Sequence, residues 1–300
     1  MVTVEPHREG HLDELQRLIN CHLDRVVAGW RLPAEVIAGS LEPPSDDHGP
    51  DPWVTDRHTL CAVEDDRLLG AAHVLRYGPG PEVGSGYRDA AELAWLLFWP
   101  EAQGAAQPLV GAAREQVAEW GASHLYACDT SLPVPVISGV PESWPHVSAA
   151  LLRSGFRPLP AYESVIYGGR LPDPGDDDPP IPGLQMRAAA DEPGHRFLAE
   201  LRGAEVGFLD WTPDLSFGGT LPALAGWAHL TSVAVREEWR GRGIGPWLVR
   251  RTVPFLRMVG ARRVVAAMTA AEEAAGSGAM CRRLGWDRLV RLEQGWSDVP

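Results

Sequence analysis

The spacing of apolar residues along the chain predicts alternating strands and helices. In the first half, apolar positions recur at helical spacing over residues 10–28, 107–120 and 147–154. Shorter apolar runs predict strands, and two of them flank a charged turn at residues 64–67. The strands predicted in this half are residues 2–5, 59–63, 68–76, 92–99, 124–129 and 164–168.

The second half shows a similar order of predicted elements. Strands are expected at residues 184–188, 197–201, 205–211, 226–235, 263–268 and 289–293, and helices at 243–259 and 272–284. Because the two halves share one outline, the pattern indicates an internal duplication. The second half has only residues 189–196 between its first two strands, where the first half has a long helical region.

Residues 170–183 separate the two halves. Five prolines and four aspartates within these fourteen residues disfavour both a helix and a central strand, so the segment is expected to be an extended linker. The sequence therefore predicts two mixed α/β domains of mostly antiparallel sheet flanked by helices, over residues 1–169 and 184–300. Three hundred residues suit two domains of ordinary size.

Composition indicates the class of protein and the cellular compartment to expect. The chain is 45% hydrophobic and 22% charged, which is typical of a globular protein. The N-terminus has no basic segment followed by an apolar one, and the apolar runs are too short for a membrane helix, so we expect a cytoplasmic protein without a membrane partner. Four scattered cysteines and no Cys-x-x-Cys pair predict reduced thiols and no metal site.

The formal net charge is −13, and every basic side chain other than histidine is arginine. A negative protein repels nucleic acid overall, so a nucleic-acid partner is not expected. An anionic ligand would need a local cluster of arginines and backbone amides to hold it.

Residues 233–245 carry the strongest functional signal. The apolar run 233–235 leads into a turn rich in arginine and glycine, and that turn opens the helix expected from residue 243. Unpaired N–H groups and the positive end of the helix dipole converge at a helix start. Glycines at 241, 243 and 245 let a ligand approach the backbone, and this combination favours binding of a diphosphate.

Two other phosphate-binding patterns do not fit this turn. A dinucleotide fingerprint needs a third glycine three residues after the second, and residues 246–248 are Pro-Trp-Leu. A Walker loop needs a lysine, and the chain contains none.

The run Arg240-x-x-Gly243-x-Gly245 after Val-Ala-Val resembles the coenzyme-A signature of the GNAT superfamily of N-acetyltransferases. The order of the surrounding elements and the closing Cys281–Trp286 segment are also similar to that family, over about 110 residues. The tandem layout resembles that of mycothiol-synthase-type members more weakly. The resemblance implies acetyl-coenzyme A, or another acyl-coenzyme A, as co-substrate.

The resemblance also implies roles for individual residues. The backbone of Val233, Ala234 and Val235 would pair with the pantetheine arm, and the thioester would lie where the fourth and fifth strands of the domain splay apart. The diphosphate would bind the amides of Arg240, Gly241, Arg242, Gly243, Ile244 and Gly245.

Acyl transfer to an amine needs a base that removes a proton from the ammonium group. His229 lies on the same predicted strand, and strict alternation places it on the face of Val233 and Val235. In the histone-acetylating branch of the family, a glutamate occupies the matching place. Glu272 and Glu273 are alternative carboxylates, although a solvated helix start also explains them.

The family's usual general acid is a tyrosine, and Cys281 stands at that position here. A thiol is a weak proton donor. Three possibilities therefore stay open: Cys281 replaces the tyrosine as general acid, solvent protonates the leaving thiolate instead, or Cys281 only packs in the core.

The first half departs further from the family pattern. Its expected diphosphate turn, residues 101–108, has Ala106 and Pro108 where glycines are expected and no arginine nearby. We therefore expect a degenerate unit that does not hold the coenzyme in the standard way and helps to roof the acceptor site. Trp211, Phe217 and Trp227, in or beside the loop 212–225, are candidates for lining that site or for core packing.

The resulting hypothesis is an N-acyltransferase acting on an amine of a small molecule by direct attack in a ternary complex. The alternatives are a non-catalytic acyl-coenzyme A binder and other thioester chemistry, such as decarboxylation of malonyl-coenzyme A. The acceptor, the acyl length and the oligomeric state stay open.

Overall fold

The computed structural model describes residues 1–42, 53–128, 132–159, 163–174, 178–189 and 195–298. The chain forms two compact units, each built around one sheet. The first unit comprises Met1–Glu163 with Arg291–Pro300, and the second comprises Ser164–Val290. Among the described residues, no helix is long and apolar enough to cross a membrane.

The first unit contains a seven-stranded sheet in the order β1-β2-β3-β4-β5-β15-β7. Its strands are β1 (Thr3–Pro6), β2 (Val54–Glu64), β3 (Arg67–Tyr77), β4 (Ala91–Phe98), β5 (Leu125–Ala127), β7 (Arg157–Pro158) and β15 (Trp296–Ser297). Its helices are α1 (Leu12–Asp24), α2 (Ala34–Leu41), α3 (Ala106–Trp120) and α4 (Pro145–Arg153). The first four strands pair antiparallel, and β4 and β5 pair parallel on either side of α3.

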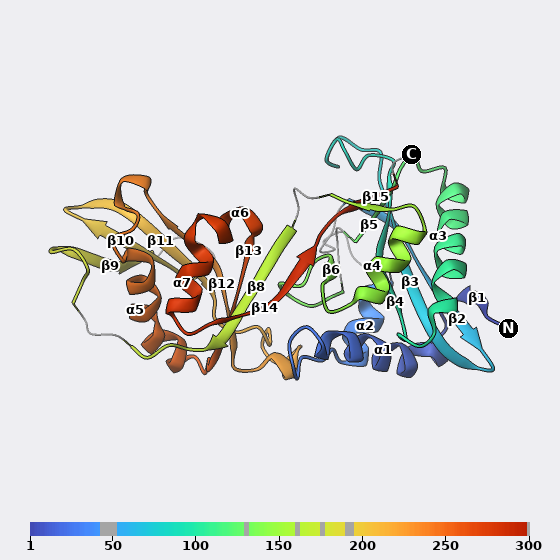
Figure 1. Ribbon diagram of the computed structural model, residues 1–300, viewed down its shortest axis with the longest axis horizontal. Helices are drawn as coiled ribbons and strands as arrows, with labels where there is room; N and C mark the ends of the chain where they lie inside the picture. The colour runs from blue at the N-terminus through green and yellow to red at the C-terminus, as the bar shows by residue number, and fades with distance from the viewer. Residues whose placement is uncertain (43–52, 129–131, 160–162, 175–177, 190–194, 299–300) are drawn as a thin grey trace. The chain divides into compact units, whose positions relative to one another are not determined.

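The second unit repeats this arrangement in the order β14-β8-β13-β12-β11-β10-β9 (Figure 1). The last residues of β14, Leu292 and Glu293, belong to the first unit and pair there with the short strand β6 (Val140–Pro141). Its strands are β8 (Glu163–Arg170), β9 (Leu184–Ala188), β10 (His195–Leu201), β11 (Ala204–Thr212), β12 (Trp227–Val235), β13 (Arg263–Thr269) and β14 (Asp287–Glu293). Its helices are α5 (Ile244–Met258), α6 (Ala270–Glu272) and α7 (Gly278–Arg283).

Each sheet includes a strand that comes from the other half of the sequence. Strand β8 comes before the proline-rich segment, yet it pairs antiparallel with β13 along seven residues. Strand β15, at the C-terminal end, pairs with β5 and β7 of the first sheet. The predicted division into residues 1–169, 170–183 and 184–300 differs from this grouping, because periodicity locates a strand but not its partner. Residues 175–177 of the predicted linker lie outside the described residues.

The core of the second unit explains why these strands and helices hold together. Helix α5 turns a stripe of buried residues, including Leu248, Val249, Val253 and Leu256, toward the sheet. The indole N–H of Trp211 in β11 donates to Thr252 Oγ1 of α5 at 3.0 Å. The predicted helix 272–284 is interrupted, because Gly276 adopts a φ of 122° between α6 and α7. This irregular turn borders the site described next.

Candidate functional site

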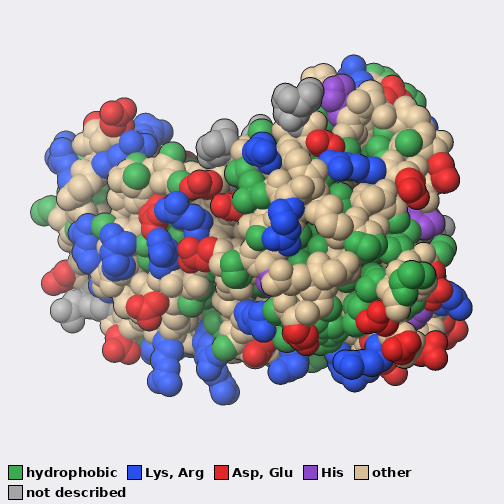
Figure 2. Space-filling view, turned by 45° about the vertical axis from the view of Figure 1, so that its right-hand side comes forward, with side chains coloured by type: hydrophobic (Ala, Val, Ile, Leu, Met, Phe, Trp, Pro, Cys, Tyr) green, Lys and Arg blue, Asp and Glu red, His purple; other side chains and the backbone are tan. Residues whose placement is uncertain are grey.

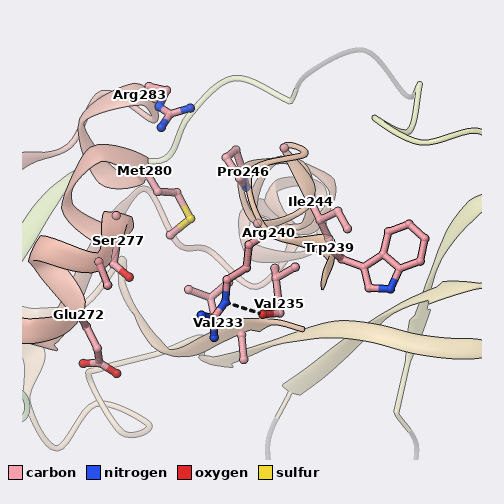
Figure 3. A pocket seen from close by; sticks show the side chains of 16 residues that line it. Val233, Val235, Trp239, Arg240, Ile244, Pro246, Glu272, Ser277, Met280 and Arg283 are labelled. Atoms are coloured by element: carbon pink, nitrogen blue, oxygen red, sulfur yellow. Dashed lines mark hydrogen bonds between the residues drawn. The ribbon is translucent and has the colours of Figure 1, made fainter. Parts of the chain in front are cut away.

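A cleft of about 540 Å³ lies where β12, the start of α5 and the α6–α7 segment meet (Figure 3). We call it the coenzyme cleft. It is lined by Val233, Ala234, Val235, Trp239, Arg240, Gly241, Gly243, Ile244, Gly245, Pro246, Glu272, Ala275, Gly276, Ser277, Met280 and Arg283. Eight of the nine residues predicted to bind the coenzyme are in this lining, and Arg242 is the exception.

The cleft opens because two neighbouring strands separate. Strands β12 and β13 pair parallel from Trp227–Arg263 to Leu230–Ala266, and beyond that register they continue to Val235 and Thr269. On its other side, β12 stays paired with β11 up to Val235. One backbone edge of residues 233–235 therefore faces the cleft, where an extended ligand can pair with it like an added strand.

Backbone geometry at the turn explains its glycines. Gly241 and Gly243 have φ values of 74° and 82°, in the left-handed region that L side chains rarely adopt. Gly245 has an ordinary φ, but a Cβ there would lie 3.1 Å from Met280 Sδ. Conformation thus favours glycine at two positions, and close packing between α5 and α7 favours it at the third.

The start of α5 offers backbone donors to a ligand. The first hydrogen bond of the helix ladder runs from Trp247 N to Gly243 O at 3.1 Å, so the amides of Ile244 and Gly245 lie ahead of it. Pro246 has no N–H and stands in the first turn, where none is needed. These donors, together with the helix dipole, favour an anion in the cleft.

The two arginines of the turn have different surroundings. Arg240 lines the cleft, and its Nε donates to Val235 O at 3.1 Å (Figure 3). Arg242 instead lies over the ring of Trp239, 4.8 Å from its centre, and donates to Glu238 O. Arg240 thus ties the turn to β12, while the guanidinium of Arg242 packs on Trp239.

The structure places His229 on a different face from the one that strict alternation predicts. Asp210 pairs with Ser232 and Trp211 pairs with Leu230, so a β-bulge at Thr231 adds one residue to β12. As a result, Val233 packs with the core on the same face as Leu230, and His229 lies on the opposite face. Sequence alone does not reveal such a bulge.

His229 nevertheless lies close to the separation of the strands. It pairs with Val265 of β13, and the next pair, Leu230 with Ala266, is the last one between the two strands. Burial lowers the pKa of its imidazole to about 4, so the ring is neutral and able to accept a proton at neutral pH. The low pKa also makes it a weaker base than an exposed histidine.

Cys281 lies in the core of the second unit. Its side chain is 0% exposed, and burial raises the pKa of the thiol to about 12. Cys281 is absent from the lining of the cleft. Of the three readings that the sequence left open for it, the geometry favours core packing.

The two candidate glutamates differ in their contacts. Glu272 lines the coenzyme cleft and closes a capping box with Thr269, whose hydroxyl donates to its carboxylate at 2.9 Å. Glu273 accepts a hydrogen bond from the hydroxyl of Tyr167 at 2.7 Å. Both carboxylates are therefore engaged in holding the α6–α7 segment.

Tyr167 is a site-supporting residue that the sequence analysis did not single out. It lies on β8 and is 1% exposed. Its hydroxyl donates to Glu273 and accepts from Arg282 Nη1 at 2.7 Å, and burial followed by the Glu273 bond raises its pKa. Through these contacts β8 fixes the segment that forms one wall of the cleft. No local pattern near residue 167 indicates this role.

The first unit has no equivalent cleft among the residues described. Its parallel pair β4–β5 ends at Leu93–Ala127, and apolar side chains such as Leu132, Ile137 and Trp144 occupy the space beyond it, which leaves only about 10 Å³. Its helix α3 begins at Ala106, so Pro108 stands in the first turn without an N–H to offer. This geometry supports the expectation that the first unit does not hold the coenzyme in the standard way.

Known proteins share this fold. A tandem GNAT protein from the clavulanic acid biosynthesis pathway superimposes with a TM-score of 0.61 at 15% identity, over 100% of this chain and 99% of its own. A GCN5-related N-acetyltransferase from Sphaerobacter thermophilus gives 0.61 at 16% identity, over 99% of this chain and 94% of its own. A fungal multi-domain GH3 β-N-acetylglucosaminidase with a GCN5-related glucosamine N-acetyltransferase region gives 0.61 at 16% identity, and 99% of this chain covers 38% of that protein.

These similarities define the class of fold as a tandem GNAT arrangement. Residues 164–286 also match the model of the acetyltransferase (GNAT) family. The second unit is therefore similar in sequence to the acetyltransferase (GNAT) family, and the whole chain shares the fold of tandem GNAT proteins. No curated protein matches the sequence. Among the described residues, no group of three or more His, Cys, Asp or Glu side chains is arranged to hold a metal ion.

Proposed function

We propose that the second unit transfers an acetyl or other short acyl group from coenzyme A to an amine of a small molecule. The observation that carries this proposal is the coenzyme cleft, where the edge of β12 and the amides ahead of the α5 ladder meet. Coenzyme A fits this arrangement because it joins an extended amide-bearing arm to a diphosphate. None of the four cysteines, all of which lie in the described part of the chain, forms a disulfide bond, which suits a reaction in the reducing cytoplasm.

Each part of the cleft has a task in this proposal. Acetyl-coenzyme A, when bound, would supply the acyl group as an activated thioester. The backbone of Val233–Val235 would align the pantetheine arm, and the amides of residues 241–245 would hold the diphosphate. Arg240 would keep the turn in place through its bond to Val235 O.

His229 is the group that we assign to proton removal. It lies beside the point where β12 and β13 separate, on the face opposite α5, so an amine approaching from that face would meet its neutral imidazole. Phe217, in the loop before β12, is 54% exposed, and its ring would be available to an acceptor. Trp211 and Trp227 are 2% and 8% exposed, so they serve the core.

The test combines calorimetry with product analysis. We expect the full-length protein to bind acetyl-coenzyme A with measurable heat and to release free thiol when an amine acceptor from a broad panel is added. Absence of binding would refute the proposal. Binding without thiol release across the panel would favour a non-catalytic acyl-coenzyme A module. Loss of carbon dioxide from malonyl-coenzyme A, seen by product mass, would favour decarboxylation.

A further inference from the structure

The first unit contains a polar cleft of about 520 Å³ along helix α1. We call it the α1 cleft. It is lined by Gln16, Arg17, Asn20, Cys21, Asp24, Arg25 and Arg31. None of these residues lines the coenzyme cleft, so the two clefts are separate spaces.

Hydrogen bonds from α1 hold the opposite wall of the α1 cleft in place. The side-chain amide of Asn20, which is 7% exposed, donates to Leu32 O at 3.0 Å and accepts from Leu32 N at 2.7 Å. Asp24 Oδ1 accepts from Gly29 N at 2.9 Å. The short segment that carries Arg31 is therefore tied to α1 on both sides of that residue, and the cleft exists before any ligand enters it.

Arginines approach the α1 cleft from both of its walls. Arg17 and Arg25 stand four residues before and four residues after Cys21, so they share its side of α1 with about 12 Å of helix rise between them. Arg31 comes from the segment opposite. The cleft runs along the C-terminal half of α1, where the backbone N–H groups are bonded within the helix, so side chains must hold any ligand.

Positive charge exceeds negative charge in this cleft. Arg17 pairs with Glu14 at 3.2 Å and Arg31 pairs with Asp24 at 3.8 Å, and both arginine side chains are more than half exposed. Exposed ion pairs of this kind are weak and exchange readily for a better partner. Among the residues that the structure describes, Arg25 forms no ion pair, and Asp24 is the single acidic residue of the lining.

This excess of arginine contrasts with the rest of the protein. The net charge of the chain is −13, and positive and negative side chains are interspersed over the face shown in Figure 2. A guanidinium group donates two parallel hydrogen bonds to a carboxylate or a phosphate. Because the three arginines are spread over two helical turns and two walls, they suit a ligand with several anionic groups better than a single small anion.

We propose that the α1 cleft binds a small polyanion, a metabolite with two or more carboxylate or phosphate groups, held by Arg17, Arg25 and Arg31. The proposal does not depend on the coenzyme site. It gives the first unit a ligand site of its own, in a part of the chain that is not expected to hold the coenzyme in the standard way. Binding should weaken as salt rises, because all three contacts are exposed charges.

Cys21 reports whether the α1 cleft is occupied. It lines the cleft and is partly exposed, while the other three cysteines are at most 3% exposed. A neutral maleimide should therefore label the folded full-length protein once, at Cys21, as mass spectrometry of the protein and its peptides shows. Citrate, a tricarboxylate, should slow this labelling in a saturable manner. Sodium chloride and sodium acetate at matched ionic strength should not.

Variants test which charges hold the citrate, each measured against its own labelling rate without citrate. Arg25→Ala should raise the citrate concentration that gives half-protection about fivefold. The buried cysteines should stay unlabelled, which shows that the variant is folded. Arg153→Ala is the matched control, because Arg153 is an exposed arginine at the end of α4 in the same unit and does not line the α1 cleft.

Asp24→Asn should act in the opposite direction. It removes the negative charge of the lining and keeps the side-chain oxygen that accepts from Gly29 N, so citrate should protect Cys21 at a lower concentration than in the wild type. An unchanged half-protection concentration would refute the proposal even if Arg25→Ala proved to be unfolded.

Two results with the other proteins would also overturn the proposal. One is that citrate slows the labelling of the wild type no more than acetate does at the same ionic strength. The other is that Arg25→Ala and Arg153→Ala change half-protection equally, since this would show a general effect of net charge rather than a site at α1.

Discussion

Replacing Gly243 with alanine should weaken coenzyme A binding far more than its effect on stability would suggest. Gly243 has a φ of 82° and immediately precedes α5. An added Cβ would meet only Pro180 Cβ at 3.5 Å, which is an ordinary contact. The cost of the substitution is therefore conformational, and it falls on the peptide that orients the proposed diphosphate donors.

The loss of stability and the loss of affinity have different physical causes. Holding an alanine in the left-handed region costs about 1–2 kcal/mol of folding free energy. If the backbone relaxes instead, at least one amide turns away from the ligand. A hydrogen bond to a charged group contributes about 1.5–3 kcal/mol. Affinity for coenzyme A should then fall roughly tenfold to a hundredfold.

Gly203 provides a matched control. It has a φ of 79°, open space around its Cβ position, and a place in the turn between β10 and β11, away from the cleft. Gly203→Ala should lower stability in thermal unfolding by a similar amount and leave the calorimetric affinity unchanged. Wild-type affinity in Gly243→Ala, or equal loss of affinity in both variants, would refute the reasoning that these amides hold the ligand.

Five further outcomes are expected. His229→Gln should lower kcat at least about a hundredfold with little change in KM for acetyl-coenzyme A. Because burial lowers the pKa of His229 to about 4, the wild-type rate should show no imidazole limb between pH 5 and 8, and a limb near pH 6.5 that His229→Gln removes would contradict this. Tyr167→Phe should reduce stability by about 1–3 kcal/mol and raise KM for acetyl-coenzyme A, since Glu273 and Arg282 lose their shared partner; an unchanged KM would rule out the positioning role. Cys281→Ala should keep kcat within about threefold of the wild type, because the thiol is buried with a pKa of about 12; a loss above about a hundredfold would restore Cys281 as the general acid. A fragment of residues 184–300 should be insoluble in expression trials, because it lacks β8, and a soluble fragment that binds coenzyme A would contradict the importance of that strand.

Much of the second unit could be predicted because its signals are local. Apolar residues at helical spacing predict helix α5. The glycines predict the turn before it, and two of them, Gly241 and Gly243, have positive φ values in the structure. Eight of the nine predicted coenzyme residues line one cleft for the same reason: a strand, a turn and a helix start that are contiguous in sequence stay contiguous in space.

The remainder could not be predicted because it depends on pairing between distant segments. The bulge at Thr231 leaves no mark in composition, yet it moves His229 to the other face of β12. The lining by Ser277 and Met280 depends on how α7 packs against α5, which periodicity does not specify. Arg250 and Arg283 are thirty-three positions apart in the sequence and line one cleft only because α5 and α7 pack together.

The exchanged strand explains why the wall of the cleft depends on residues that precede the proline-rich segment. Strand β8 pairs with β13 on one side and neighbours β14 on the other, so it is an interior strand of the second sheet. Among the described residues, the hydroxyl of Tyr167 is the group that hydrogen-bonds both to Glu273, at the irregular turn, and to Arg282, near the end of α7. Because the turn at Gly276 breaks the helix, α6 and α7 need such a brace to keep a fixed angle. The position at which the family pattern places a tyrosine holds a buried cysteine here, and the tyrosine hydroxyl next to this segment comes instead from β8. We infer that this hydroxyl positions the cleft wall, since Tyr167 is buried against α7 and does not line the cleft.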